Sequence, residues 1–209
     1  MFPSITEMGM PALLPHQGMT LNVETGTVLL DGMPTASTVE RQAVLQAAAP
    51  TGRALSAAAY LDMSAADRKE LLKSSEIVYL YHNKIDATGE KLATESDVFD
   101  ACAESVDELV SIAKRVCTDA PGARVTITSD HGFLYTANEL PECLFLGKND
   151  LPDDPVLFGK RHAVVAQGDA LADITNGADG SPYLAMNMDH VAPGGGYVGL
   201  APRGIVHYK

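Results

Sequence analysis

A strand, a long amphipathic helix and a second strand follow one another over residues 77–128, and this pattern constrains the fold more than any other feature. Residues 77–81 form a short β-branched and aromatic run that is typical of a buried strand. Residues 94–117 predict a helix, because apolar positions recur at three- and four-residue spacing. This apolar stripe comprises Val98, Cys102, Val106, Leu109, Ala113 and Val116. With a second strand at 124–128, the pattern predicts a right-handed parallel crossover whose helix covers one face of the sheet.

Shorter elements flank this unit. Residues 21–31 alternate around Thr25-Gly26 and predict a hairpin. Helices are expected at 37–49 and 64–73, each with a serine cap and an acidic residue three positions later. Further strands are expected at 53–59, 163–166, 183–186 and 197–200. The sequence therefore predicts an α/β fold.

Length and composition narrow the class of protein. The 209 residues fit one sizeable α/β domain, and the net charge of −12, without a Lys/Arg cluster, argues against a general nucleic-acid-binding surface. No apolar run approaches the roughly 20 residues that a membrane helix needs, and residues 1–10 do not look like a signal peptide. The cysteines Cys102, Cys117 and Cys143 are expected to be buried reduced thiols, which points to the cytoplasm.

Chemistry-bearing side chains follow both strands of the crossover. The first strand runs into residues 82–90, with the sequence HNKIDATGE, and the second runs into Ser129-Asp130-His131-Gly132. Parallel strands end at one edge of a sheet, where open α/β folds bind ligands. Carboxylates and imidazoles are ligands for zinc and manganese, so a metal site is one interpretation. The alternative is that the aspartates cap turns and that His82 is a satisfied polar residue at a strand end.

Three segments carry a family resemblance: FPSITEMGMPALLPH, VYLYHNKIDATGE and VTITSDHGFLY. Together they resemble the PglZ domain of BREX and phage growth limitation systems, which belongs to the alkaline phosphatase superfamily. The resemblance covers most of the chain. It implies a three-layer α/β/α sandwich with a mainly parallel sheet and two metal ions at its C-terminal edge. Residues 1–209 would be a fragment of one such domain.

The resemblance also assigns metal ligands. Asp130 and His131 match the superfamily's Asp-His pair and would bind one divalent ion. Asp86 matches the aspartate of an Asp-x-x-x-His pair for the second ion, with Glu90 in place of the histidine. His82 would be a second-shell group or a substitute ligand. The implied ions are zinc, with manganese as the alternative.

Thr6, in Pro3-Ser4-Ile5-Thr6, matches the hydroxyl nucleophile of the superfamily, whereas the residues alone favour a turn or cap threonine. The resemblance implies a metal-dependent phosphatase or phosphodiesterase of a phage-defence protein. Its substrate would be a phosphate ester or nucleotide-type molecule, and its partners other defence proteins. The alternative is an inactive scaffold that binds those partners, which the Glu90 substitution favours.

Two family features are not found in this sequence. The family has an aspartate ligand on a strand upstream of the threonine motif, and a His-Gly-Gly that completes the second metal site. His207 is followed by Tyr208 and does not match that motif. We therefore expect a fragment with incomplete metal sites, which binds zinc or manganese weakly and hydrolyses phosphate esters poorly.

Overall fold

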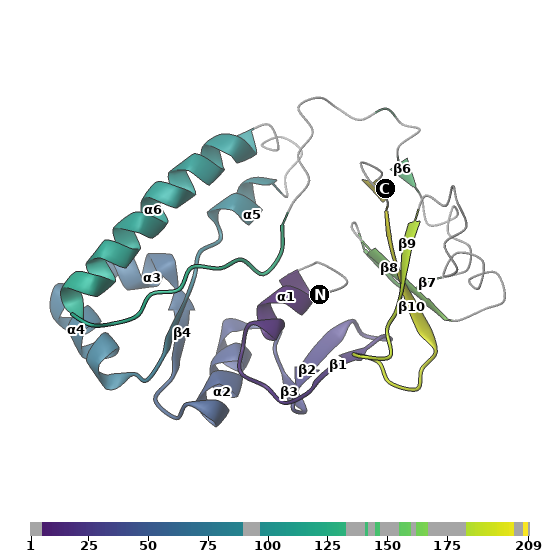
Figure 1. The fold of residues 1–209 in the computed structure, drawn as a ribbon, viewed down its shortest axis with the longest axis horizontal. Coiled ribbons are helices and arrows are strands. Elements are labelled where there is room, and N and C mark those ends of the chain that lie inside the picture. The colour runs from purple at the N-terminus through teal and green to yellow at the C-terminus, as the bar shows by residue number, and fades with distance from the viewer. Residues whose placement is uncertain are drawn as a thin grey trace. The chain divides into compact units, whose positions relative to one another are not determined.

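The computed structural model describes residues 6–89, 97–132, 141, 145–146, 155–159, 162–166, 183–202 and 207–208 (Figure 1). The chain forms two compact units. Unit 1 comprises Met1–Glu40 with Ser129–Lys209, and unit 2 comprises Arg41–Thr128. The assignment of residues 1–209 to one domain stays a prediction.

Unit 1 is rich in antiparallel strands. Its described elements are α1 (Thr6–Ala12), β1 (Met19–Asn22), β2 (Thr27–Leu30), β3 (Met33–Pro34), β6 (Phe145–Leu146), β7 (Pro155–Gly159), β8 (His162–Ala166), β9 (Tyr183–Asn187), β10 (Tyr197–Pro202) and β11 (His207–Tyr208). One antiparallel sheet has the order β1-β2-β3 and another the order β7-β8-β10-β9, while β6 and β11 pair in parallel. The strands expected at 163–166, 183–186 and 197–200 are confirmed as β8, β9 and β10.

The predicted hairpin at 21–31 is confirmed as β1 and β2. Its turn is stabilised by the Asn22 side chain, which accepts hydrogen bonds from the backbone N–H groups of Glu24 and Thr25. Gly26, in the same turn, has a φ of 69°. At the base of the hairpin, the Asp31 carboxylate accepts hydrogen bonds from the backbone N–H groups of Gln17 and Gly18. These bonds lower the pKa of Asp31, because they favour its charged form.

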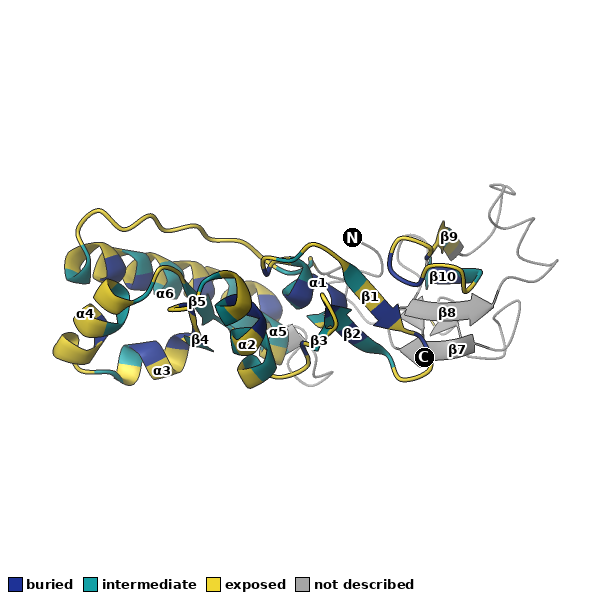
Figure 2. Cartoon of the chain, turned by 90° about the horizontal axis from the view of Figure 1, so that it is seen from below, coloured by how far each residue is buried: buried dark blue, intermediate teal, exposed yellow. Residues whose placement is uncertain are grey.

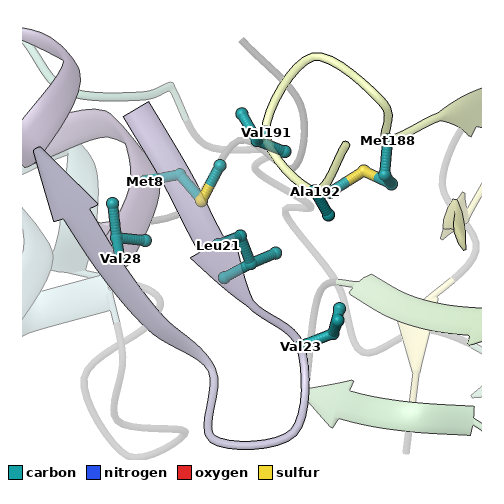
Figure 3. Close-up of a cluster of buried hydrophobic side chains, with 7 residues drawn as sticks. All are labelled: Met8, Leu21, Val23, Val28, Met188, Val191 and Ala192. Carbon is teal, nitrogen blue, oxygen red and sulfur yellow. The ribbon is translucent and has the colours of Figure 1, made fainter. Parts of the chain in front are cut away.

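The core of unit 1 joins the N-terminal segment to residues far along the chain (Figure 3). Met8 of α1 is buried against the β1–β2 hairpin and the turn that follows β9. The Leu21 N–H donates to the Val191 carbonyl over 2.6 Å, which adds a backbone link to the apolar contact. The buried cluster consists of Met8, Leu21, Val23, Val28, Met188, Val191 and Ala192. This core holds α1 in place on unit 1.

Unit 2 contains most of the helices. Its elements are α2 (Thr38–Ala48), which begins at the unit boundary, then β4 (Arg53–Ser56), α3 (Ala57–Asp62), α4 (Ala65–Ser74), β5 (Val78–Tyr81), α5 (Lys84–Gly89) and α6 (Val98–Asp119). The predicted capping box at Ser37 and the predicted serine cap at Ser64 are confirmed. Ser37 and Glu40 exchange hydrogen bonds at the start of α2, and Ser64 caps α4 by accepting from the Asp67 N–H. The expected strand at 53–59 ends at Ser56, whose side chain caps α3.

A parallel pair of strands forms the centre of unit 2. β4 pairs with β5 in parallel, with Leu55 opposite Leu80, and α3 and α4 make the crossover between them. Tyr60, Ile112 and Val116 form a buried cluster against which both leucines pack. Helix α6 therefore packs against this strand pair, as expected for the helix. Its predicted start at residue 94 lies outside the described residues.

The prediction that residues 124–128 form the second strand of the crossover is wrong. Residues 124–128 form no strand, and Val125 and Ile127 are exposed; β4 is the strand that pairs with β5. Strand propensity reflects how well a side chain fits a paired, half-buried surface, and the exposed side chains of Val125 and Ile127 are not part of one. The described residues also form four small sheets and not one mainly parallel sheet. The three-layer sandwich remains a proposal.

The predicted apolar stripe of α6 agrees only in part with the positions that are buried. Val98 and Val116 are buried, but Val106 is 59% exposed. The other buried positions of the helix are Ala101, Ser105 and Ile112, so the buried face does not include Val106. Figure 2 shows buried and exposed positions together along α6. Cys117, expected to be buried, is exposed, Cys102 is half-buried, and Cys143 lies outside the described residues.

None of the described helices combines the length and the apolar composition that a membrane-spanning segment needs.

Candidate active site

Thr6 and His131 meet within unit 1, although 125 positions separate them in the sequence. Thr6 is the first residue of α1, and the burial of Met8 fixes that helix on the core. The Thr6 Oγ1 atom lies 3.0 Å from Nε2 of His131. A hydroxyl within hydrogen-bonding distance of an imidazole is the arrangement in which a base can orient and activate a nucleophile.

The hydrogen bonds of His131 determine which ring nitrogen carries the proton. Nδ1 lies 2.9 Å from the carbonyl oxygen of Gly132, and a carbonyl oxygen can only accept. In the neutral ring Nδ1 therefore carries the hydrogen, and Nε2 accepts from the Thr6 hydroxyl. The His131 side chain is only 7% exposed, so its orientation is well restrained. Metal-binding histidines commonly use the same backbone-carbonyl contact to present the other nitrogen.

Asp130 brings a carboxylate to the same place. Its Oδ2 atom lies 3.7 Å from Nε2 of His131, and its side chain is 23% exposed. The distance is too long for a hydrogen bond and short enough for a Coulombic contact if the ring is protonated. Thr6, Asp130 and His131, three of the residues singled out from the sequence, therefore cluster in unit 1.

The donor types of this cluster suit a divalent ion. Carboxylate and imidazole are zinc ligands, and a deprotonated hydroxyl can join them. Within the part of the chain that the structure describes, however, no three His, Cys, Asp or Glu side chains converge on a point. The residues therefore fit part of a metal site, with Asp130 and His131 as strong donors.

His82, in unit 2, has a different environment. Its Nε2 atom lies 2.8 Å from Oε2 of Glu108 on α6. The other carboxylate oxygen of Glu108 binds Lys84 Nζ over 2.5 Å, and Lys84 also contacts Glu104 over 2.7 Å. The salt-bridge cluster, defined as His82, Lys84, Glu104 and Glu108, thus ties the segment after β5 to α6. Sequence reasoning missed both glutamates, although their spacing of four on one helix face was the available signal.

The partners of this cluster shift one another's protonation. The hydrogen bonds that Lys84 donates to Glu104 and Glu108 raise the pKa of Lys84, because they favour the ammonium form. Hydrogen bonds from Lys84, and then from His82, lower the pKa of Glu108. A contact between one ring nitrogen and a carboxylate is also how metal-binding histidines are oriented, so both predicted roles of His82, support of a ligand or replacement of one, stay predictions.

The remaining predicted ligands are Asp86 and Glu90. Asp86 lies in the first turn of α5 in unit 2, and Glu90 lies outside the described residues. Asp86 and the Asp130–His131 pair belong to different units, each described by itself. Their convergence around a pair of metal ions stays a prediction.

Comparison with known proteins identifies the family. The model of the BREX system PglZ alkaline phosphatase-like domain matches residues 1–174, which is most of the chain. The chain belongs to the PglZ family. This finding confirms the resemblance carried by the three sequence segments, and it relates the Thr6–His131 site to an alkaline phosphatase-like family.

Two curated relatives agree with this PglZ assignment. The alkaline phosphatase-like protein BrxZ of Escherichia coli O9:H4 (strain HS) is 34% identical over 139 residues, 66% of this chain. The alkaline phosphatase-like protein PglZ of Bacillus cereus (strain H3081.97) is 29% identical over 206 residues, 97% of this chain. The matched regions span only 16% and 22% of the lengths of these two proteins. No solved structure matches the chain significantly.

Proposed function

We propose that this PglZ-family chain carries part of the active site of a metal-dependent phosphatase or phosphodiesterase in a phage-defence protein, with Thr6 as the nucleophile. The observation that carries the proposal is the 3.0 Å contact between Thr6 Oγ1 and His131 Nε2. It joins two residues that the same family resemblance singled out, one as nucleophile and the other as ligand. The alkaline phosphatase-like names of BrxZ and PglZ support the reaction class.

The proposed chemistry begins with the orientation of Thr6. The hydrogen bond directs the hydroxyl hydrogen toward Nε2, which leaves a lone pair of Oγ1 for attack on phosphorus. The attack forms the Oγ1–P bond and breaks the bond to the leaving oxygen. The Thr6 proton passes to Nε2 of His131, which returns it to Oγ1 when the phosphothreonine is cleaved, and the leaving alkoxide takes a proton from water and departs as an alcohol. Water next cleaves the phosphothreonine, releases phosphate and restores the hydroxyl.

Divalent ions would assist at this site. Asp130 and His131 would hold one ion, and Asp86 with Glu90 the second, with His82 behind them. When bound, such ions neutralise charge on the phosphoryl group and lower the pKa of the hydroxyl, so that proton transfer to the histidine is no longer required. Zinc is the proposed metal, with manganese as the alternative.

The substrate and setting follow from the same proposal. The substrate class is a phosphate ester, diester or nucleotide, and the partners are other proteins of the defence system. A cytoplasmic location accords with both. These statements concern the whole protein and are proposals, because the chain spans about a fifth of the length of its curated relatives.

The test is hydrolysis of p-nitrophenyl phosphate and of its bis ester by the full chain, with added zinc or manganese. Thr6→Ala should lower turnover on the order of 1,000-fold, because the nucleophile is lost, whereas Thr6→Ser retains a hydroxyl and most of the activity. Turnover that survives Thr6→Ala would refute the proposed nucleophile.

One observation favours the alternative function, an inactive scaffold. No three metal-ligating side chains converge among the described residues, and Glu90 replaces the family histidine. A scaffold predicts no metal-dependent turnover in the full chain, while binding of partner defence proteins persists in Thr6→Ala and Asp130→Ala. The two functions are therefore separable by the same pair of variants.

A further inference from the structure

We infer that Gly9 is a positioning residue, which sets the approach of Thr6 to the Asp130–His131 pair. The inference rests on the proposed function. It states that position 9 must carry a residue without a side chain. Gly9 is buried in α1, one turn after Thr6.

The evidence is the space around Gly9. A Cβ atom added there would overlap the carbonyl oxygen of Asp130, and would lie 2.8 Å from its carbonyl carbon and 3.0 Å from its Cβ. Two of these obstacles are backbone atoms, which cannot rotate aside as a side chain does. By contrast, a Cβ added to Gly132 would meet no described residue within 4 Å. The close approach is therefore specific to Gly9 and does not extend to the other glycine of this site.

The geometry of a helix connects this contact to the nucleophile. Residues three apart lie on the same helix face, so Thr6 and Gly9 face the same segment. Thr6 contacts the side chain of His131, and Gly9 contacts the backbone of the residue before it. One turn of α1 thus makes two contacts with consecutive residues. A methyl group at the second contact must separate α1 from that segment, and so lengthen the Oγ1–Nε2 distance.

If Gly9 affected only the local backbone conformation of α1, Gly9→Ala would have the opposite effect. Alanine has a higher helix propensity than glycine, so without the packing contact Gly9→Ala would leave α1 unchanged or stabilise it. The close approach predicts a loss instead. The sign of the effect therefore separates a packing role from local backbone preference.

The test is the ring ¹⁵N signals of His131 in the full chain, measured for the original sequence, Thr6→Val, Gly9→Ala and the double variant. Thr6→Val should shift the Nε2 signal, because the hydroxyl donor is lost. Gly9→Ala should produce a similar shift, and Thr6→Val should then add little to it, because the same hydrogen bond is already lost. Glu7→Ala, at an exposed position of the same helix, is the control and should leave the signal unchanged.

Activity supplies the second readout. Where the original chain turns over an aryl phosphate ester, Gly9→Ala should lower kcat on the order of 100-fold, as expected for misplacement by about 1 Å, and should retain a cooperative thermal transition. An unchanged Nε2 signal in Gly9→Ala would overturn the inference. So would the absence of any cooperative transition, since the claim is that the fold tolerates the methyl group and the Thr6–His131 contact does not. Because the signal needs no turnover, an inactive original chain would refute the proposed function and leave this test valid.

Discussion

The two units hold their chemistry-bearing histidines in opposite ways. In unit 1, His131 is nearly buried, contacts a hydroxyl and a backbone carbonyl, and presents a lone pair at Nε2. In unit 2, Nε2 of His82 faces the carboxylate of Glu108, which also binds Lys84. The first arrangement places a ring nitrogen beside a hydroxyl, whereas the second places a ring nitrogen beside a carboxylate. The contacts of each ring, more than the residue type, indicate where chemistry is to be expected.

The distinction between His131 and His82 would be wrong if both were equally required for turnover. His131→Ala should lower turnover on the order of 1,000-fold, because it removes both the partner of Thr6 and a proposed ligand. His82→Ala should have a smaller effect, about 10- to 100-fold, as is typical for a group that orients a ligand. Steady-state kinetics on the full chain measures both, and zinc titration calorimetry shows whether affinity follows. A loss in His82→Ala as large as that in His131→Ala would contradict the distinction.

A buried ion pair in unit 2 tests whether the charged side chains of this unit contribute to stability. Arg68 Nε lies 2.8 Å from Asp119 Oδ2, and both side chains are at most 10% exposed. Asp119→Ala should lower the free energy of unfolding by about 3–5 kcal/mol, because it leaves a buried guanidinium unpaired. Urea unfolding measures this loss. At a temperature where the variant is folded its turnover should be normal; a selective loss of turnover would instead connect this pair to the active site.

The smallest effect is expected at the salt-bridge cluster of unit 2. Glu108→Gln should destabilise the chain more than Glu104→Gln, because Glu108 accepts from both His82 and Lys84, whereas among the described residues Glu104 pairs with Lys84 only. Both glutamates are more than one-third exposed, so high salt should reduce the difference. Equal stabilities of the two variants at low salt would show that the contact with His82 contributes nothing.

This contribution should also depend on pH. The pKa of Glu108 is lowered from an ordinary value of 4.5, so its stabilisation is present above that value and is lost as the pH falls through the folded pKa. The pKa of Lys84 is raised from 10.5, so its stabilisation is present below that value and is lost as the pH rises through the folded pKa. Urea unfolding of Glu108→Gln and the original chain should therefore differ most between these two values.

The sequence predicted those parts of the fold that local interactions determine. The serine caps at Ser37 and Ser64 and the turn at Gly26 depend on residues within a few positions of one another, and all three are confirmed. The strand expected at 124–128 depends on a distant ladder partner, which propensity does not specify. The exposed position of Val106 likewise depends on which face of α6 meets its neighbours.

The same limit applies to the candidate site. Family motifs selected Thr6 and His131, but their 3.0 Å contact depends on the packing of α1 onto a segment more than 100 residues away. Nothing in the sequence marked Gly9 as the residue that permits the approach. Glu108 was missed because its partner His82 lies on another element and the pairing is tertiary. The family motifs name candidate residues, whereas the contacts between them depend on the tertiary fold.

The most direct test of the central claim is to trap the covalent intermediate. The full chain would be incubated with an aryl phosphate ester and zinc, quenched in acid, and digested for mass spectrometry. The account predicts a phosphoryl group on Thr6, present in the original chain and absent from Thr6→Ala. Metal-dependent hydrolysis with no phosphoryl group on Thr6, and with undiminished turnover in Thr6→Ala, would contradict it.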